Sequence, residues 1–170
     1  MKRNGTYALD FQGPALVGGH ITYLRGRRYL NRVVALCFLP YARLVPAEKL
    51  DRQARRFHEI GAALLIVASI ARPLHRLWAG ERDKPVTPVL ADLCGRLHRS
   101  FGVPVEEPAR RYQTFIIDRT GILRLRVNHD FFWQDLTVLG STIGVTPRPA
   151  ANERDSDADS RAAGALSLPG

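Results

Sequence analysis

Two cysteines are the side chains of this sequence best suited to covalent chemistry, because a thiolate is a strong nucleophile and a metal ligand. Cys37 and Cys94 lie far apart, and the chain contains no C-x-x-C pair. The sequence therefore indicates neither a zinc ribbon nor a dithiol redox motif. A disulfide between the two would require Cα atoms within about 7 Å of each other, which their positions do not establish. Thiol chemistry here would depend on one cysteine.

The neighbours of each thiol predict different reactivity. Cys37 lies in an apolar run, where burial raises a thiol pKa and hides the sulfur, so we interpret it as an inert core residue. Cys94 follows Asp92 and Leu93 near the start of a helix expected to end at Phe101, where the helix dipole would lower a thiol pKa. The alternative for Cys94 is an ordinary packing or surface-turn position. Both remain candidate thiols, with Cys94 preferred.

The other polar side chains show no catalytic or metal-binding pattern. The chain has five histidines: His20, His58, His75, His98 and His129. None has H-x-x-x-H spacing, so no metal and no cofactor is expected. Asp10 and Glu48 have no evident partner for acid–base work, and Asp118 is expected to begin a turn. Gly18 and Gly19 are interpreted as a turn between two edge strands, not as a phosphate loop.

The length and composition fit one folded domain. The 170 residues are 45% hydrophobic and 24% charged, which excludes a disordered or disulfide-dense chain. The longest apolar runs, Val33 to Leu39 and Ala62 to Ala68, are far shorter than the roughly 20 residues of a membrane-spanning helix. No secretory signal pattern follows Met1. We therefore expect a cytoplasmic protein without a membrane segment.

The charge balance is unusual, with 25 Lys and Arg against 16 Asp and Glu, or +9. Residues 147–170 are rich in Pro, Ala, Ser and Asp and lack aromatic residues, which predicts a disordered tail behind a domain at residues 1–146. A positive field favours anionic partners, including nucleic acid, on which Tyr23, Tyr29 and Tyr41 could stack beside nearby Arg. Alternatively, these tyrosines belong to an oligomer contact and the scattered Arg are solvated cations.

Apolar runs alternate with amphipathic stretches, as expected for a sheet covered by helices. Strands are predicted at residues 32–39 and 62–69, with a helix at residues 46–61 between them. That helix has an apolar stripe of Leu50, Ala54, Phe57 and Ile60, and it ends at Gly61. Further helices are predicted at residues 73–79, 93–101 and 131–143. A hairpin is predicted at residues 114–127, with its turn at residues 118–121. This order predicts an α/β, thioredoxin-like fold with a central mixed sheet.

Six segments occur in an order that carries a family resemblance. They are Leu9-Asp10-Phe11, Val33 to Pro40, Gly61 to Ser69, His75 to Trp78, Pro88 to Asp92 with Phe101-Gly102-Val103, and Phe115-Ile116-Ile117-Asp118-x-x-Gly121-Ile122-Leu123-Arg124. Together they resemble a peroxiredoxin of the alkyl hydroperoxide reductase/thiol-specific antioxidant type, over about residues 8 to 140. The resemblance implies the thioredoxin-like fold and thiol-dependent peroxide reduction. It also makes a homodimer plausible.

The resemblance further implies a P-x-x-x-T-x-x-C motif at the start of the helix after the central strand. A helix amino terminus and an Arg lower the pKa of such a thiol, and the Thr hydroxyl and backbone donors hold the peroxide. This chain departs from the motif. Counting from Pro40, Leu44 occupies the Thr position and Ala47 the Cys position, and other alignments place Val45 or Arg43 there. No alignment supplies a cysteine, so the covalent step is lost.

The activating Arg of the family is displaced as well. It would precede Phe115 by three residues, where this chain has Tyr112, with Arg111 adjacent. Three hypotheses remain. The first is a divergent redoxin domain without peroxidatic turnover that binds an unknown protein partner or a small anion. The second is a thiol-dependent peroxidase or oxidoreductase that uses Cys94 or Cys37, and the third is a basic nucleic-acid-binding module. In the first, the vestigial pocket consists of Pro40, Arg43, Leu44, Val45, Ala47, Arg111 and Tyr112.

Overall fold

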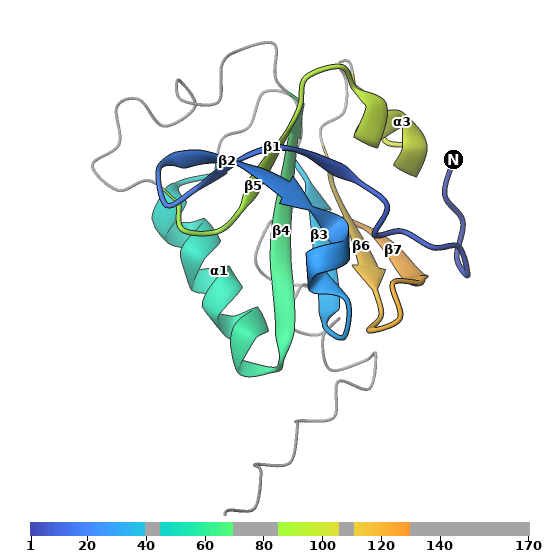
Figure 1. Cartoon of the computed structure of the whole chain (residues 1–170), viewed down its shortest axis with the longest axis horizontal. Helices are drawn as coiled ribbons and strands as arrows, with labels where there is room; N and C mark the ends of the chain where they lie inside the picture. Colours follow the sequence, from blue (N-terminus) through green and yellow to red (C-terminus); the bar gives the residue numbers. More distant parts are fainter. Residues whose placement is uncertain (40–44, 70–84, 106–110, 130–170) are drawn as a thin grey trace, which may run out of the picture.

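Seven strands form one mixed sheet in the order β2-β1-β5-β4-β3-β6-β7 (Figure 1). The computed structural model describes residues 1–39, 45–69, 85–105 and 111–129. The strands are β1 (Gln12–Val17), β2 (His20–Arg25), β3 (Val33–Phe38), β4 (Ala62–Ser69), β5 (Val89–Asp92), β6 (Tyr112–Ile117) and β7 (Leu123–His129). The helices are η1 (Gly26–Tyr29), a 3-10 helix, and the α-helices α1 (Ala47–Glu59) and α3 (Arg96–Phe101). The predicted helices at residues 73–79 and 131–143 and the predicted tail at residues 147–170 lie outside the described residues.

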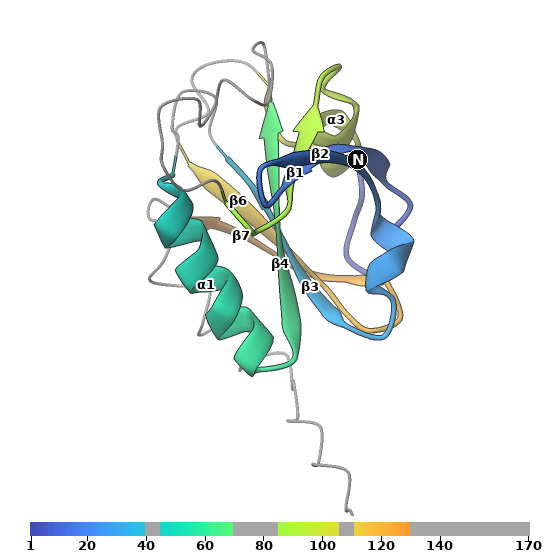
Figure 2. The same ribbon diagram turned by 60° about the vertical axis from the view of Figure 1, so that its left-hand side comes forward.

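The central strands β3 and β4 pair in parallel, as do β4 and β5. Every residue of β3 is buried, as its uninterrupted apolar sequence predicts. Alternate residues point to opposite faces of a strand, so Val33, Ala35 and Cys37 join one hydrophobic cluster and Val34 and Leu36 join another. The sheet therefore has a core on each face. Figure 2 shows α1 on one side of β4 and both η1 and α3 on the other.

Helix α1 covers the first of these cores. Pro46 stands immediately before the helix, where its missing N–H leaves no hydrogen bond unmade. Leu50 and Phe57 are buried, and Ala54 and Ile60 pack against the same cluster, which confirms the predicted apolar stripe. Neither α1 nor α3, the α-helices of the described ranges, has the length and apolar character needed to cross a membrane. The helix thus lies between β3 and β4 in the chain and covers the sheet face that carries this core.

The hairpin of β6 and β7 closes one edge of the sheet. Its turn lies at residues 118–121, as predicted, and Gly121 has a φ of 84°, which favours glycine. The Asp118 carboxylate holds the turn by accepting from the N–H groups of Thr120 and Ile122 and from the Thr120 hydroxyl. The strands extend beyond the predicted residues 114–127, because the pairing continues to Tyr112 and His129.

The chain around Cys94 differs from the prediction. Residues 89–92 form a short strand, and the helix predicted at residues 93–101 begins only at Arg96. Gly95 has a φ of 64°, a left-handed conformation that interrupts a helix. The Asp92 carboxylate accepts the backbone N–H of His98 at 2.7 Å, so Leu93 and Cys94 form a turn between strand and helix.

Truncation of Phe57 tests the α1 core. Phe57 is 1% exposed, and Phe57→Ala should lower the free energy of unfolding by about 3–5 kcal/mol because it leaves a cavity. Urea denaturation measures this change. The neighbouring Arg56 is exposed, and Arg56→Ala should stay within about 0.5 kcal/mol of the wild type. Equal losses in the two variants would contradict the packing of α1 described here.

The turn at Asp118 predicts a dependence of stability on pH. Burial alone would raise the pKa of Asp118, but hydrogen bonds from Thr120, Ile122 and Arg124 lower it to about 2. The folded pKa lies below the unfolded value of about 3.9, so this stabilisation is complete above that value and is lost as the pH falls toward 2. The free energy of unfolding of Asp118→Asn should therefore fall less than that of the wild type between about pH 4 and pH 2, the range between the two pKa values. Urea denaturation at several pH values measures this difference.

A matched control for this experiment is Glu59→Gln. Glu59 is an exposed acid at the end of α1, and no described residue donates a hydrogen bond to its carboxylate. In Glu59→Gln the free energy of unfolding should fall at low pH about as much as it does in the wild type. The same flattening in both variants would show that the effect comes from overall charge and not from the turn.

Candidate functional site

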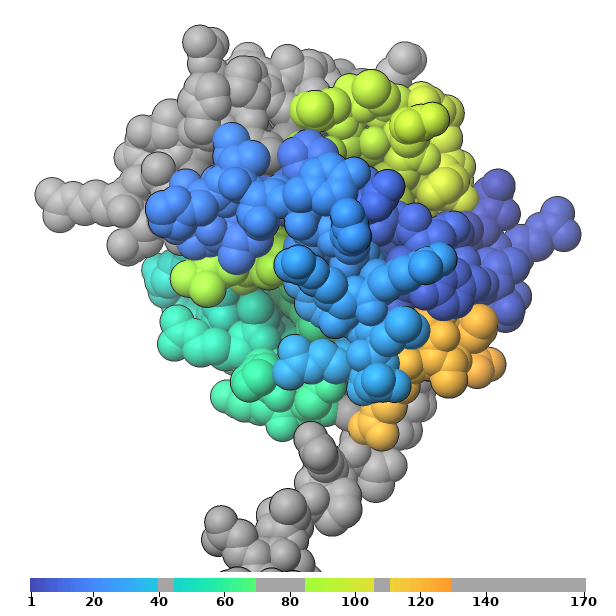
Figure 3. Space-filling view, viewed as in Figure 1, coloured from blue at the N-terminus to red at the C-terminus, as the bar shows by residue number. Residues whose placement is uncertain are grey.

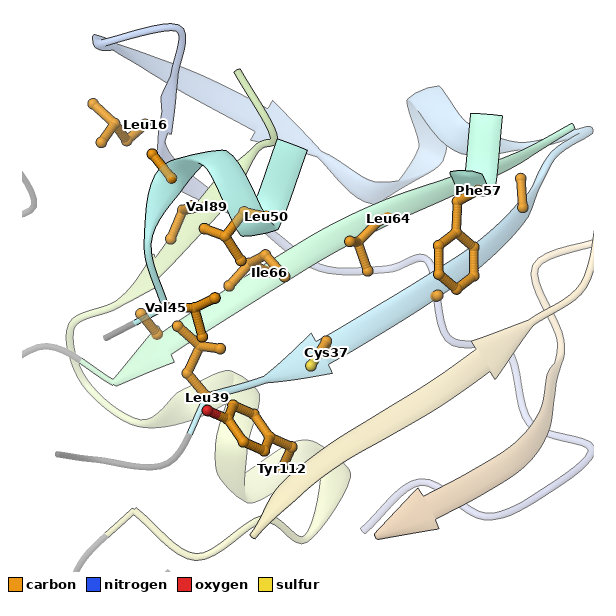
Figure 4. Packing of buried hydrophobic residues seen from close by; sticks show 14 of the residues in the cluster. Leu16, Cys37, Leu39, Val45, Leu50, Phe57, Leu64, Ile66, Val89 and Tyr112 are labelled. Carbon is orange, nitrogen blue, oxygen red and sulfur yellow. The ribbon is translucent and has the colours of Figure 1, made fainter. Parts of the chain in front are cut away.

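The expected vestigial pocket lies where β3 ends and where α1 and β6 begin. Val45 and Ala47 are each 2% exposed and Tyr112 is 6% exposed, and all three belong to the hydrophobic cluster that contains Cys37. Figure 4 shows the Tyr112 ring beside Leu39, with Val45 nearby. Three further predicted pocket residues, Pro40, Arg43 and Leu44, lie outside the described residues.

Cys37 lies deep in this cluster, and its sulfur has no exposed surface. Burial raises the pKa of the Cys37 thiol to about 12, although a hydrogen bond with the Thr114 side chain acts in the opposite direction. Cys37 and Thr114 face each other across the antiparallel pair of β3 and β6. At neutral pH the thiol is therefore protonated and out of contact with solvent, as its apolar surroundings in the sequence predict.

A polar chain continues from this thiol across the sheet. Thr114 Oγ1 lies 2.8 Å from Nε2 of His129, and both residues are buried. Tyr112 pairs with His129 across β6 and β7, and the two rings stack with centroids 5.6 Å apart and planes at 16°. Buried hydroxyl and imidazole groups require such partners, because an unsatisfied polar group costs about 1–3 kcal/mol.

In this arrangement a thiol, a hydroxyl and an imidazole are connected by successive hydrogen bonds, from Cys37 to Thr114 and from Thr114 to His129. Such a series of groups can activate a nucleophile. Activation also requires that a substrate reach the sulfur, and Cys37 is 0% exposed. In the described residues the polar chain therefore satisfies buried groups within the core. Tyr112, which stands where the resemblance implies an Arg, contacts this polar chain because its ring stacks on His129.

Cys94 lies in a different place, in the turn after β5, and its side chain is exposed. It lines a groove of about 490 Å³ formed by the amino-terminal segment, β1, β5 and α3. Two cations, Lys2 and Arg96, line the same groove, and Lys2 Nζ pairs with Asp10 at 2.8 Å. Among the predicted pocket residues that the structure describes, Val45, Ala47, Arg111 and Tyr112, none lines this groove with Cys94.

A buried hydrogen bond between a carboxylate and an imidazole lies behind this turn. His98 Nδ1 lies 2.7 Å from Asp92 Oδ2, the oxygen that also accepts the His98 N–H. Burial would raise the pKa of Asp92, but the hydrogen bonds from His98 lower it below its ordinary value. The His98 ring packs edge-on against Phe38 at 4.9 Å, and His98 does not line the groove. Asp92 itself lines the groove beside Cys94, with its Oδ2 engaged by the backbone N–H and the ring of His98.

Sequence reasoning did not identify these two polar pairs. Both partners of the Asp92–His98 pair lie within one short segment, and a carboxylate a few residues before a helix can accept an N–H group of its first turn. The Tyr112–His129 pair follows from the hairpin register once its turn is placed. Across the described ranges, no three His, Cys, Asp or Glu side chains gather into a group that could hold a metal ion.

Comparison with solved structures identifies the fold. AhpC of Enterococcus faecalis superposes with a TM-score of 0.67 and 20% identity, covering 84% of this chain and 91% of that one. The reduced 2-Cys peroxiredoxin of Plasmodium vivax gives 0.65 and 18% over 82% and 95% of the two chains. AhpC of Mycobacterium tuberculosis gives 0.67 and 16% over 84% and 93%.

No family model matches the sequence, and no curated protein matches it. The structural similarity shows a peroxiredoxin-like thioredoxin fold, which confirms the predicted fold class. At these low identities it shows the fold alone, so the chemistry must be argued from the residues of this chain.

The two thiols should differ sharply in reactivity toward Ellman's reagent. A pKa of about 12 leaves Cys37 on the order of a thousandfold less thiolate than an ordinary cysteine, and its burial adds to this protection. In the native protein one thiol should therefore react quickly with the reagent, and the second should react only when the protein unfolds. Cys37→Ser should keep the fast phase and Cys94→Ser should lose it. A fast phase in native Cys94→Ser would contradict the burial of Cys37.

Proposed function

We propose that this chain is a divergent redoxin domain that has lost peroxidatic turnover and acts by binding. The observation that carries the proposal is the replacement of the nucleophile by buried apolar side chains. Val45 and Ala47 stand at the start of α1, where the resemblance expects a cysteine, and both pack into the core. The peroxide-cleaving step needs a thiolate that attacks the O–O bond, and neither residue can supply one.

The position of Cys37 supports the same proposal. Cys37 belongs to the same hydrophobic cluster as Val45 and Ala47, so it is the first candidate for a thiol that could replace the missing nucleophile. A pKa of about 12 and the absence of exposed surface both oppose that role. Exposure of this sulfur would require β3, an interior strand of the sheet, to separate from β4 and β6.

The binding face we propose is the surface over the vestigial pocket. Arg111 is exposed beside Tyr112, and Lys49 is exposed in the first turn of α1. The amino end of a helix carries partial positive charge, which favours an anion at the same place. The ligand would be a small anion or the acidic surface of a protein partner. A homodimer and a cytoplasmic location belong to the same proposal, and two unpaired cysteines are typical of that compartment.

A second candidate function, thiol chemistry at Cys94, is favoured by one observation. Cys94 is exposed in a groove that Lys2 and Arg96 also line, so a substrate can reach its sulfur. Such a groove could admit a peroxide or a disulfide substrate. Asp10 and Asp92 also line the groove, but the carboxylate of Asp10 pairs with Lys2 and that of Asp92 is engaged by His98.

Stopped-flow measurement of hydrogen peroxide consumption with dithiothreitol distinguishes the two candidates. The wild type, Cys37→Ser and Cys94→Ser should all consume peroxide at the rate of the reductant and an ordinary free thiol, because no cysteine stands at the start of α1 and Cys37 is buried. Fast turnover that disappears in Cys94→Ser would establish the second candidate. Fast turnover that disappears in Cys37→Ser would overturn both the proposal and the inert role of the core cysteine.

A further inference from the structure

A second cavity lies at the opposite end of α1, where the three parallel strands begin. Strand β5 is shorter than β4 and pairs only with Ile66 to Ser69. The edge of β4 from Ala62 to Leu64 therefore has no β5 neighbour. The resulting cavity has a volume of about 360 Å³, within the size range of small-ligand sites. We call it the β4 notch and define it by Tyr29, Arg32, Ala54, Arg55, Leu64 and Pro88.

Two secondary-structure elements form the walls of the β4 notch. Arg55 and His58 come from the last turns of α1, whereas Tyr29 ends η1 and Arg32 precedes β3. Figure 3 shows part of β4 between the α1 and η1 segments on this side of the molecule. The notch is remote from the vestigial pocket, which lies at the other ends of β3 and α1.

Positive charge in the β4 notch exceeds negative charge. Arg32 and Arg55 both line it, and within the described ranges neither forms an ion pair with a carboxylate. Asp51 is the acid among the lining residues. Its Oδ1 accepts from the Thr87 N–H at 2.8 Å and the Thr87 hydroxyl at 2.6 Å, and its Oδ2 accepts from the Val86 N–H at 3.1 Å. Asp51 is therefore committed to holding residues 86 and 87, and the guanidinium groups remain available to a ligand.

The rest of the β4 notch is apolar or neutral. Ala54, Leu64 and Pro88 supply its aliphatic surface. Burial raises the pKa of the Tyr29 phenol, although Arg32 and Arg28 oppose the shift, so this group stays protonated and can donate a hydrogen bond. A cavity of this kind suits a molecule with an anionic end and an apolar body, because guanidinium groups bind carboxylate and phosphate oxygens in pairs.

We propose that the β4 notch binds a small organic anion, with its carboxylate or phosphate between Arg32 and Arg55 and its apolar body against Ala54, Leu64 and Pro88. This site is separate from the vestigial pocket and does not depend on the function proposed for it. Its limited volume favours a small molecule of one or two rings over a polymer.

NMR titration of the ¹⁵N-labelled full chain with 2-naphthoate tests the proposal, because amide shifts report both affinity and location. A ligand of this size should bind with a Kd on the order of 1 mM or tighter. The largest shifts should fall at Arg55, Ala63 and Thr87. Arg55→Gln should weaken binding about tenfold or more, since it removes a hydrogen bond between charged groups. The control Arg56→Gln removes the same charge from an exposed α1 residue outside the notch and should change the Kd less than about twofold.

Three further probes identify what the site recognises. The neutral 2-naphthalenemethanol should bind about tenfold more weakly than 2-naphthoate, because it cannot pair with the guanidinium groups. Comparison of 2-naphthyl phosphate with 2-naphthoate distinguishes a phosphate from a carboxylate ligand. Inorganic phosphate should bind more weakly than 2-naphthyl phosphate, because it gains nothing from the apolar surface.

Several results would overturn the proposal. One is the absence of saturable shifts at about ten times the expected Kd. Another is an equal loss of affinity in Arg55→Gln and Arg56→Gln, which would mean attraction to the overall positive field. Shifts confined to the Tyr112 and Arg111 region would assign the anion to the vestigial pocket instead. Peroxide turnover by the protein would contradict only the proposed function, since the β4 notch contains neither cysteine.

Discussion

The parallel pairing of β3 with β4 is the constraint on which the rest of this structure depends. Six consecutive residues of each strand are in register, from Val33 with Ala62 to Phe38 with Val67. Both strands are buried on two faces, so each face must be covered, by α1 on one side and by η1 and α3 on the other. The two ends of this pair also define the two candidate binding sites, the vestigial pocket at the carboxyl ends and the β4 notch at the amino ends.

The burial that stabilises this core also suppresses its chemistry. A thiol within the central strand has a low tendency to ionise and no route to solvent, and Cys37 shares its cluster with Val45 and Ala47. The polar groups near it, Thr114 and His129, are buried partners of each other. The fold thus resembles that of the peroxiredoxins, while Val45, Ala47 and Tyr112 at the expected reaction centre are buried in the core, and the binding role that we propose is based on this difference.

Acidic side chains in the described residues are largely committed to local structure. Asp51 holds the segment before β5, Asp92 caps the turn before α3, and Asp118 holds the hairpin turn. Each stabilises a backbone conformation by accepting N–H groups. The arginines outnumber such acids, so guanidinium groups such as those of Arg32 and Arg55 are left for solvent or for an anion. The excess positive charge of the chain, +9 in total, is therefore available at surfaces such as the β4 notch.

Much of the fold followed from the sequence because its signals are local. The apolar run of β3, the stripe of α1 and the Asp118 to Gly121 turn each depend on near neighbours in the chain, and the structure confirms all three. The helix expected from residue 93 was wrong at its start, because Gly95 and the Asp92 cap outweigh the helix-favouring residues around them. Strand β5 was missed because its four residues are too few to show a period.

For the candidate sites, too, some features follow from the sequence and others only from the tertiary structure. The sequence by itself determined that no cysteine stands at the start of α1 and that Tyr112 stands where the resemblance implies an Arg, since these are questions of residue identity. Only the tertiary structure decided that Tyr112 stacks on His129, that Cys94 lies away from the pocket, and that Arg32 and Arg55 meet in one cavity. Contacts between residues distant in the chain depend on strand order and register, and these are set by the packing of the whole sheet.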